Sequence, residues 1–401
     1  MKRLHDYREI VGDRVLSDIY QTARKLYGKR VVHINSTYTG GGVAEILNSL
    51  APLMNDVGIE AGWRILRGDS DFFTITKKFH NALQGDHIKL SELKKRHYIN
   101  TCENFSIYTH FNHDCVIIHD PQPLPLIEFY KRRQPWIWRC HIDLSNPDEE
   151  LWNFIKGFVL RYDHSIISSE IYRQPDLPIQ QRIFAPVIDP LTHKNMPLKE
   201  KEIDRNLKKH KIPTDKPILL QISRFDKWKD PLGVIDVYKR VKEKVDCRLV
   251  LCGSMAADDP EGLDIYLKVK KQANHMVETR DIILITYENN VLVNALQRKA
   301  AVILQKSIRE GFGLTVTEGL WKGKPVVGSR VGGIPIQIQD GKTGFLVEPK
   351  AHDKIANIIV DILKNPEMAK SIGKAGQEYV RQNFLITRLL HDYLKLFTEL
   401  L

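Results

Sequence analysis

One glycine-containing run of the sequence combines the residues that a phosphate and a sugar would need. It reads Glu310-Gly311-Phe312-Gly313-Leu314, with Glu318 a short distance beyond. The glycines let the backbone approach a ligand closely, and a helix that begins near Leu314 would direct its unpaired N–H groups at an anion. Side chains in the first turns lean toward the helix start, so Glu310 and Glu318 would face one side. We predict an anion site flanked by two carboxylates; the alternative is an ordinary glycine-rich turn with solvated glutamates.

Two basic residues follow an apolar run in the same half of the chain. The run is 217–223, and Arg224 and Lys229 come directly after it. An arginine offers a bidentate fork to a phosphate, and a lysine offers a point charge, so the pair could balance the charge of a diphosphate. Isolated basic residues in loops are more often ordinary surface residues. Their position at the carboxyl end of a strand favours a ligand site instead.

The first half carries a glycine loop of its own. Gly40, Gly41 and Gly42 follow the β-branched run 30–35 and precede a helical pattern that contains Glu45. Three glycines at a helix start predict a second anion cradle. The run does not match G-x-G-x-x-G, so a nicotinamide-binding interpretation is weak.

Polar residues also end two further apolar runs of the first half. His119 and Gln122 follow the run 115–118, and His141 and Asp143 follow the run 136–140. At the carboxyl edge of a sheet, His119, His141 and Asp143 could hydrogen-bond sugar hydroxyls or orient an acceptor. A single such histidine is more often a core or surface residue. Asp69-Ser70-Asp71 matches a DxD pattern, which we interpret as a polar turn, and we predict no metal ligands.

These groups must be positioned by repeated strand-loop-helix units. The first half has short strands at 30–35, 115–118 and 136–140, and the second half has strands at 217–223, 248–253, 282–285, 301–305 and 325–328 with helical stretches between them. Alternating strands and helices predict the α/β class, with two doubly wound, Rossmann-like parallel sheets that face a central cleft.

The composition changes between these halves. Prolines and a Lys/Glu-rich helix at 198–209 make the segment 189–217 resemble a linker. We therefore place one domain at 1–197 and a second at 198–382. A last amphipathic helix within 383–401 is expected to pack back on the first domain.

Composition excludes several classes of protein. The 401 residues are 42% hydrophobic and 27% charged, with no low-complexity segment, no apolar run of membrane length and no apolar leader, so we expect a cytoplasmic globular protein. Five scattered cysteines predict no disulfide framework. A net charge of +11 suits a phosphorylated substrate, a nucleic acid or an anionic surface. The basic clusters lack interleaved aromatic residues, which argues against a base-stacking platform.

Taken together, these motifs resemble the retaining nucleotide-sugar glycosyltransferases of the GT-B fold. The run 310–318, the pair Arg224 and Lys229, and the loop 40–42 carry this resemblance. More narrowly, the segments 35–47, 119–123, 138–145 and 307–318 are similar to the trehalose synthase family of the glycosyltransferring type, over nearly the whole chain.

The resemblance implies roles for individual residues. Arg224, Lys229, Glu310 and His141 would be catalytic, with the first two on the diphosphate, Glu310 on the transferred glucose, and His141 near its anomeric centre. Glu318 would hold the ribose. The remaining donor contacts would come from Gly41, Gly42, Gly311, Phe312, Gly313, Leu314 and Thr315. Asp143, Glu45 and Gln122 are our predictions for the acceptor side.

The implied reaction is transfer of glucose from a nucleoside diphosphate glucose to glucose, which gives α,α-trehalose by a front-face route. We expect no tightly bound cofactor, no nucleic acid and no membrane partner. The resemblance does not decide whether Mg²⁺ accompanies the donor, and we identify no protein ligands for it. A homodimer is a candidate assembly. The alternatives are a retaining trehalose phosphorylase, a basic non-catalytic Rossmann-type binding protein, and a nucleotide-sugar epimerase, which would need no sugar acceptor.

Overall fold

The computed structural model describes residues 2–38, 41–253, 260–287 and 289–401. By their internal contacts these residues form two compact units, one of residues up to Val187 together with Leu385–Leu401, and the other of Ile188–Phe384. The division falls before the boundary near Pro197 that composition indicated. The segment that resembled a linker belongs to the second unit, because α6 (Glu200–Lys209) packs against α10 (Asn290–Lys299).

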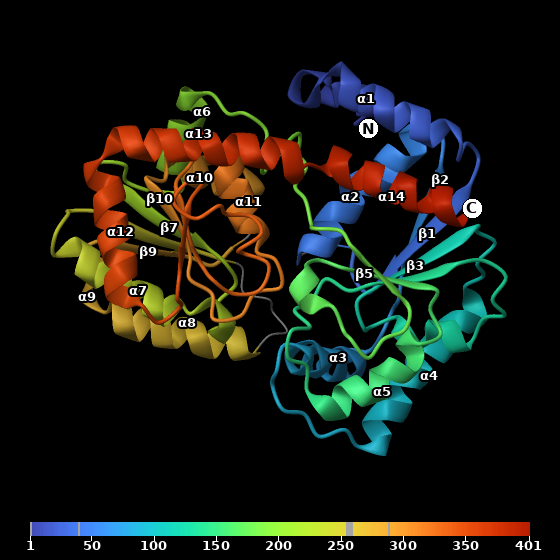
Figure 1. Ribbon diagram of the computed structural model, residues 1–401. Helices are drawn as coiled ribbons and strands as arrows, with labels where there is room; N and C mark the ends of the chain where they lie inside the picture. Colours follow the sequence, from blue (N-terminus) through green and yellow to red (C-terminus); the bar gives the residue numbers. More distant parts are fainter. Residues whose placement is uncertain (1, 39–40, 254–259, 288) are drawn as a thin grey trace. The chain divides into compact units, whose positions relative to one another are not determined.

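The first unit contains a parallel sheet in the order β2-β1-β3-β4-β5-β6 (Figure 1). Its strands in chain order are β1 Arg30–Asn35, β2 Glu60–Ile65, β3 Cys115–His119, β4 Trp136–Arg139, β5 His164–Ile167 and β6 Gln180–Ile183. Its helices are α1 Arg8–Arg24, α2 Gly41–Asp56, α3 Ser70–Leu83, α4 Glu92–Tyr108, α5 Glu149–Val159 and α14 Ile386–Leu400, with 3₁₀ turns η1 Leu4–Tyr7, η2 Leu124–Glu128 and η3 Glu170–Tyr172. The strands β1, β3 and β4 are those that the sequence predicts.

The two faces of this sheet are covered by different helices. Val32 and Ile34 of β1 share a buried cluster with side chains of α3, α4 and α5. His33 points to the opposite face, where its ring lies 5.8 Å from that of Tyr393 in α14. The helix α14 contacts α1 and α2, so it completes the first unit, as its amphipathic pattern led us to expect.

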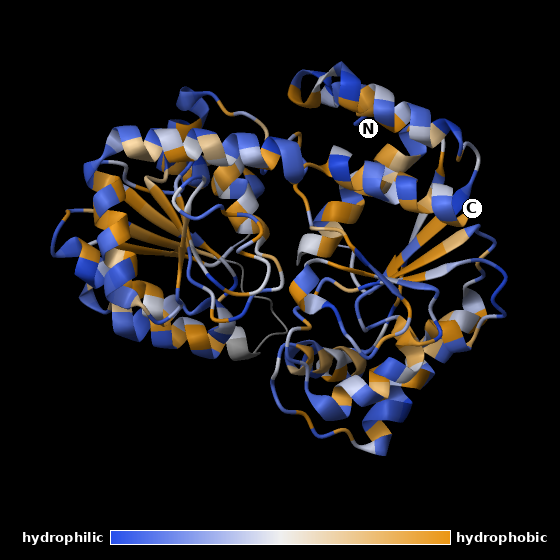
Figure 2. Cartoon of the chain, in the orientation of Figure 1, coloured by the Kyte–Doolittle hydropathy of each residue, from blue (hydrophilic) through white to orange (hydrophobic). Residues whose placement is uncertain are grey.

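The second unit repeats the architecture, with the strand order β12-β11-β10-β7-β8-β9, again parallel. Its strands are β7 Ile218–Ile222, β8 Arg248–Cys252, β9 Ile282–Ile285, β10 Val302–Gln305, β11 Val326–Ser329 and β12 Phe345–Val347. Besides α6 and α10, its helices are α7 Pro231–Lys242, α8 Pro260–Ala273, α9 His275–Glu278, α11 Leu314–Trp321, α12 His352–Lys364 and α13 Pro366–Asn383, with the 3₁₀ turn η4 Lys227–Lys229. The strands are apolar, whereas the helices present one apolar and one polar side (Figure 2).

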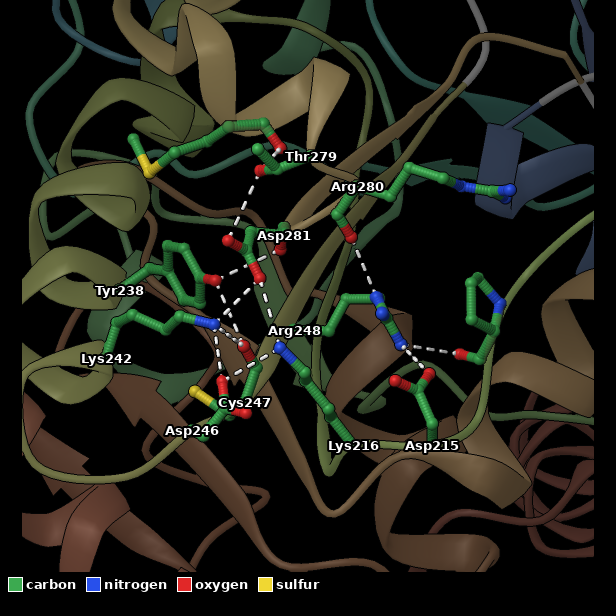
Figure 3. A network of polar contacts seen from close by, with 12 residues as sticks. Asp215, Lys216, Tyr238, Lys242, Asp246, Cys247, Arg248, Thr279, Arg280 and Asp281 are labelled. Atoms are coloured by element: carbon green, nitrogen blue, oxygen red, sulfur yellow. Dashed lines mark hydrogen bonds and ion pairs between the residues drawn. The ribbon is translucent and has the colours of Figure 1, made fainter.

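A polar network closes the amino ends of β8 and β9 (Figure 3). The Lys242 ammonium lies 2.6 Å from Asp246 Oδ1 and 2.7 Å from Asp281 Oδ1. The Tyr238 hydroxyl donates to the Asp281 carbonyl at 3.1 Å. These contacts join α7 to the amino ends of β8 and β9. The loops that carry the candidate ligand residues leave the opposite edge of the sheet, where the strands end. The network therefore stabilises the scaffold at a distance from the candidate ligand residues of this unit.

Among the described residues, no helix is both long enough and apolar enough to cross a bilayer.

Candidate functional site

In the second unit, two neighbouring strands bring a lysine and a glutamate together. The strands β7 and β10 pair in parallel, so the loops after them leave from the same edge of the sheet. The loop after β7 ends in η4 with Lys229, and the loop after β10 contains Glu310. The Lys229 Nζ lies 2.7 Å from both Oε1 and Oε2 of Glu310.

Further donors hold the Glu310 carboxylate, which is only 6% exposed. The Gln305 Nε2 donates to Oε2 at 3.1 Å, and the Ser307 hydroxyl donates to the same oxygen at 3.0 Å. Because several donors converge on this carboxylate, its position is fixed before any ligand arrives. Neither partner was predicted to act on Glu310, since a glutamine at a strand end and a serine in the loop after it are ordinary residues in the sequence.

The position of Lys229 is fixed by the residues that surround its backbone. The Gln221 Nε2 donates to the Lys229 carbonyl at 3.0 Å. The next residue, Asp230, adopts a left-handed backbone conformation and caps α7 by accepting from the Gly233 N–H at 3.1 Å. The buried Lys306 ammonium pairs with the same aspartate. These contacts hold the end of η4 against the sheet.

The helix α11 begins directly beside Glu310. Gly313 is its N-cap at φ 83°, a conformation that glycine adopts without strain. The Thr315 hydroxyl donates to the Ile222 carbonyl at 3.2 Å, which ties the helix start to the end of β7. The first N–H groups of a helix have no partner within it, and its positive dipole end lies there. Gly311, Phe312 and Leu314 complete this turn, as the sequence predicts.

Arg224 lies in the same loop as Lys229 but is held less firmly. Its Nη2 is 3.4 Å from Asp226 Oδ2, and its side chain is 47% exposed. A guanidinium with one weak contact keeps most of its donors for a ligand.

Glu318 lies in the second turn of α11 and is almost fully buried. The Lys194 Nζ is 2.9 Å from its Oε1, and the Gln297 Nε2 donates to its Oε2 at 2.9 Å. Burial alone would raise the pKa of Glu318, but the charges of Lys194 and Lys322 and the bond from Gln297 leave that pKa lowered. Lys322, itself buried, has its pKa lowered to about 7.

Lys194 was not predicted, because it is a single basic residue in a segment that resembled a linker. No local spacing marks it, and only the packing of this segment against the rest of the second unit brings it to Glu318.

In the first unit, the predicted residues gather at the carboxyl edge of β1, β3 and β4. Gly41, at φ 78°, and Gly42 open α2 after β1. Gln122 follows β3, and its carbonyl accepts a bond from the Cys102 thiol at 3.5 Å. Gly40 lies outside the described residues. Glu45 is exposed on the first turns of α2.

His141 and Asp143 follow β4 at this edge. The backbone N–H of His141 donates to Asp120 Oδ1 at 2.7 Å. The ring Nε2 of His141 lies 3.0 Å from His119 Nδ1. The buried Asp143 carboxylate accepts from the Ser145 N–H at 2.8 Å, so one of its oxygens stabilises a local turn. Asp120, for which no role was predicted, has a φ of 61°, which is strained for a residue with a side chain. Burial raises the pKa of Asp120 to about 7.

Asp69, from the DxD pattern, caps α3 by accepting from the Phe72 N–H at 2.8 Å. It also contacts His97. The helix cap agrees with the interpretation of this pattern as a polar turn.

Comparison with known proteins gives consistent matches over both units. The family model described as trehalose synthase, N-terminal domain, matches residues 33–174, and the model for glycosyl transferases group 1 matches residues 202–379. The trehalose synthase of Thermococcus litoralis is 49% identical over 402 residues, which is 98% of this chain and 96% of that relative. The trehalose phosphorylase of Grifola frondosa is 27% identical, over 94% of this chain and 58% of the phosphorylase.

Solved structures match the fold. An α,α-trehalose-phosphate synthase (UDP-forming) from Burkholderia xenovorans, in complex with glucose-6-phosphate, gives a TM-score of 0.74 at 14% identity. The match covers 93% of this chain and 100% of that one. A similarity at this level of identity shows the fold alone, which is the GT-B architecture of two Rossmann-like domains.

Proposed function

Because the chain belongs to the trehalose synthase family of GT-B glycosyltransferases, we propose that it transfers glucose from a nucleoside diphosphate glucose to free glucose. The product is α,α-trehalose, with the configuration at the donor carbon retained. The donor is a substrate in this proposal, and the proposal requires no tightly bound cofactor.

The observation that carries the proposal is the pair formed by Lys229 and Glu310 at the start of α11. The ammonium lies 2.7 Å from both carboxylate oxygens, and the helix begins at Gly313, three positions after Glu310. A diphosphate bound at the helix start would place its charge beside this ammonium and the unpaired N–H groups. Glu310 would then accept hydrogen bonds from hydroxyls of the transferred glucose. One preformed pair thus supplies a cation for the leaving group and an acceptor for the sugar.

Two other residues of the second unit extend this donor site. The exposed Arg224 guanidinium would bind the diphosphate together with Lys229 and stabilise the negative charge that develops as it leaves. Glu318 would bind the ribose hydroxyls, with its carboxylate kept ionised by Lys194 and Lys322.

The first unit would contribute the remaining groups. In this proposal the N–H groups of Gly41 and Gly42 approach the phosphate, and His141 contacts the donor sugar near its anomeric centre. Asp143, Gln122 and Glu45 contact the acceptor.

Retention is explained by a front-face reaction. The bond between C1 of glucose and the phosphate oxygen breaks, and the acceptor hydroxyl oxygen bonds to C1 on the same face. The departing phosphate oxygen takes the proton of that hydroxyl, so no carboxylate nucleophile is required. Glu310 is already engaged by three donors, which favours a binding role over attack on C1.

The proposal is tested by incubating the purified protein with glucose and, in parallel, with ADP-, UDP- and GDP-glucose. Both the saccharide and the nucleotide product are resolved. We expect trehalose with an equal amount of nucleoside diphosphate, and the same measurement identifies the preferred base. A parallel reaction contains trehalose and inorganic phosphate. Cleavage of trehalose there, with no disaccharide from any nucleotide donor, would replace the proposal with a phosphorylase.

A further inference from the structure

Three histidines form a hydrogen-bonded row across the first sheet. His33 lies in β1, His119 ends β3 and His141 follows β4, and these three strands are neighbours. His33 Nδ1 is 3.0 Å from His119 Nε2, and His119 Nδ1 is 3.0 Å from His141 Nε2. The side chains of His33 and His119 are buried, whereas His141 at the end of the row is half-buried.

The row is uncharged near neutral pH. Burial lowers the pKa of His33 to about 3. Burial also lowers the pKa values of His119 and His141 far below their ordinary value, and the charge of Arg139 adds to the effect at both residues. Each ring therefore carries one N–H and one lone pair.

The two contacts couple the proton positions of all three rings. Each contact needs an N–H on one side and a lone pair on the other. A neutral row consequently has only two arrangements, with every proton on Nδ1 or every proton on Nε2. The ring nitrogen that carries the proton in His33 thus determines whether His141 Nδ1, at the other end of the row, carries an N–H or a lone pair.

The buried end of the row distinguishes these arrangements. His33 Nε2 is buried and has no hydrogen-bond partner among the described residues. Protons on Nε2 would leave an orphaned buried N–H there, whereas protons on Nδ1 leave a lone pair. Orphaned buried N–H groups are the rarer of the two in folded proteins. The arrangement with every proton on Nδ1 is therefore favoured.

We infer that His33 and His119 are positioning residues that hold His141 with its proton on Nδ1 and so present an N–H donor to an oxygen of the donor sugar. The inference rests on the proposed function for the identity of that ligand. The structure supports the direction of the donor, because no described residue is bonded to His141 Nδ1 and the side chain reaches the surface at this edge of the sheet.

The first test reads the tautomers directly and needs no substrate. Long-range ¹H–¹⁵N correlation spectra of protein labelled in its histidine rings distinguish the two neutral tautomers, and variants at each position assign the signals. We expect His33, His119 and His141 to be neutral at pH 7 with protons on Nδ1. In His119→Leu, His141 should become a mixture of tautomers. Protons on Nε2 in the wild type, or an unchanged His141 in the variant, would overturn the inference.

The second test separates positioning from general loss of structure. His119→Asn keeps an N–H near the position of Nδ1, so it can still donate to His141, whereas His119→Leu cannot. We expect His119→Leu to lower kcat by about 10- to 100-fold, the range found for residues that orient metal-bound histidines through a hydrogen bond, with the KM for glucose little changed. His119→Asn should recover much of this loss. Equal kcat values in the two variants, at matched thermal stability, would contradict the positioning role.

The two proposals fail differently. If no nucleotide donor yields trehalose, the proposed function is wrong while the spectra still report the state of the row. If transfer is observed but the His141 tautomer does not depend on His119, only the inference is wrong. His5→Gln, which changes an exposed histidine outside the row, is the control for both tests.

Discussion

The ammonium of Lys229 and the carboxylate of Glu310 are within 2.7 Å of each other although 81 positions separate them in the chain. They meet because β7 and β10 are adjacent in the sheet and both loops leave its carboxyl edge. The pair is thus a product of sheet order, and each member fixes the other before a ligand binds.

Replacing Lys229 with alanine should lower the rate of transfer by about 10²-fold or more, because in the proposed reaction the departing diphosphate loses one of the two cations assigned to it. Arg224→Ala should act in the same direction. Steady-state kinetics with the preferred donor measure both effects. Lys227→Ala is the matched control, since Lys227 belongs to the same turn but its ammonium lies over the Trp228 ring, 4.6 Å from the centroid. Near-normal rates in both Lys229→Ala and Arg224→Ala would refute the diphosphate role.

Glu318→Gln should weaken binding of the free nucleoside diphosphate, because an amide accepts hydrogen bonds from ribose hydroxyls less strongly than a carboxylate. We expect about a tenfold higher Kd by titration calorimetry, in line with the loss of a charge-assisted hydrogen bond. Glu243→Gln, on the exposed end of α7, should leave the Kd unchanged. An unaltered Kd in Glu318→Gln would remove the ribose role.

Gly313→Ala should lower thermal stability and should also weaken binding of the donor. Gly313 has φ 83°, and a Cβ there would lie 3.1 Å from the Glu310 Cγ. The change therefore strains the backbone by about 1–2 kcal/mol and displaces Glu310. Gly323→Ala is a close control, because Gly323 has φ 68° and its Cβ would meet only the Gly373 carbonyl, at 3.9 Å. We expect similar losses of Tm in the two variants, with the KM for the donor raised only in Gly313→Ala.

The histidine row makes stability sensitive to mild acid. Below the ordinary imidazole pKa of about 6.5, the unfolded chain takes up protons that the folded row excludes, so each buried histidine lowers stability by up to about 1.4 kcal/mol per pH unit as the pH falls. For His33 this continues to its folded pKa of about 3. Urea unfolding between pH 7 and 5 should show a shallower decline for His33→Asn than for the wild type. An identical slope in His33→Asn would contradict this account.

Much of the fold follows from local pattern. The apolar runs of β1, β3 and β8 coincide with strands because such runs are buried on both faces of a parallel sheet. The strand β2 was not predicted, because its residues Glu60–Ile65 are mostly half-exposed at the sheet edge and include Trp63 and Arg64. The three residues of β12 are too few for any period to be visible.

The residues of the candidate site also fall into those that local sequence predicts and those that depend on contacts between distant segments. The turn from Glu310 to Leu314 is visible in sequence because the ligand-binding feature, a helix start, is local. Lys194 and His33 were not predicted, since their significance depends on which segments the fold brings beside them. A histidine in the middle of an apolar strand reads as core until β1 and β3 are known to be neighbours.

The network around Lys242 predicts a purely structural effect. Asp246 and Asp281 pair with two cations, Lys242 and Lys216, and Lys242→Met removes the first of these. The change should lower the Tm of the second unit by about 2–4 °C, as expected for a loss near 1 kcal/mol in a domain of this size. The kcat should not change. Lys239→Met, on the exposed side of α7, should leave both quantities unaltered in a thermal scan and a rate assay.

The first unit is discontinuous in sequence, since residues 385–401 complete it after the whole second unit. During synthesis on the ribosome, all six strands of the first sheet emerge long before α14 does. The face that α14 covers, with His33 beneath Tyr393, stays open to solvent until these last residues have been made. The first unit therefore cannot be completed until the second unit has been translated, and a chain interrupted within the second unit leaves uncovered the face of the first sheet that α14 would cover.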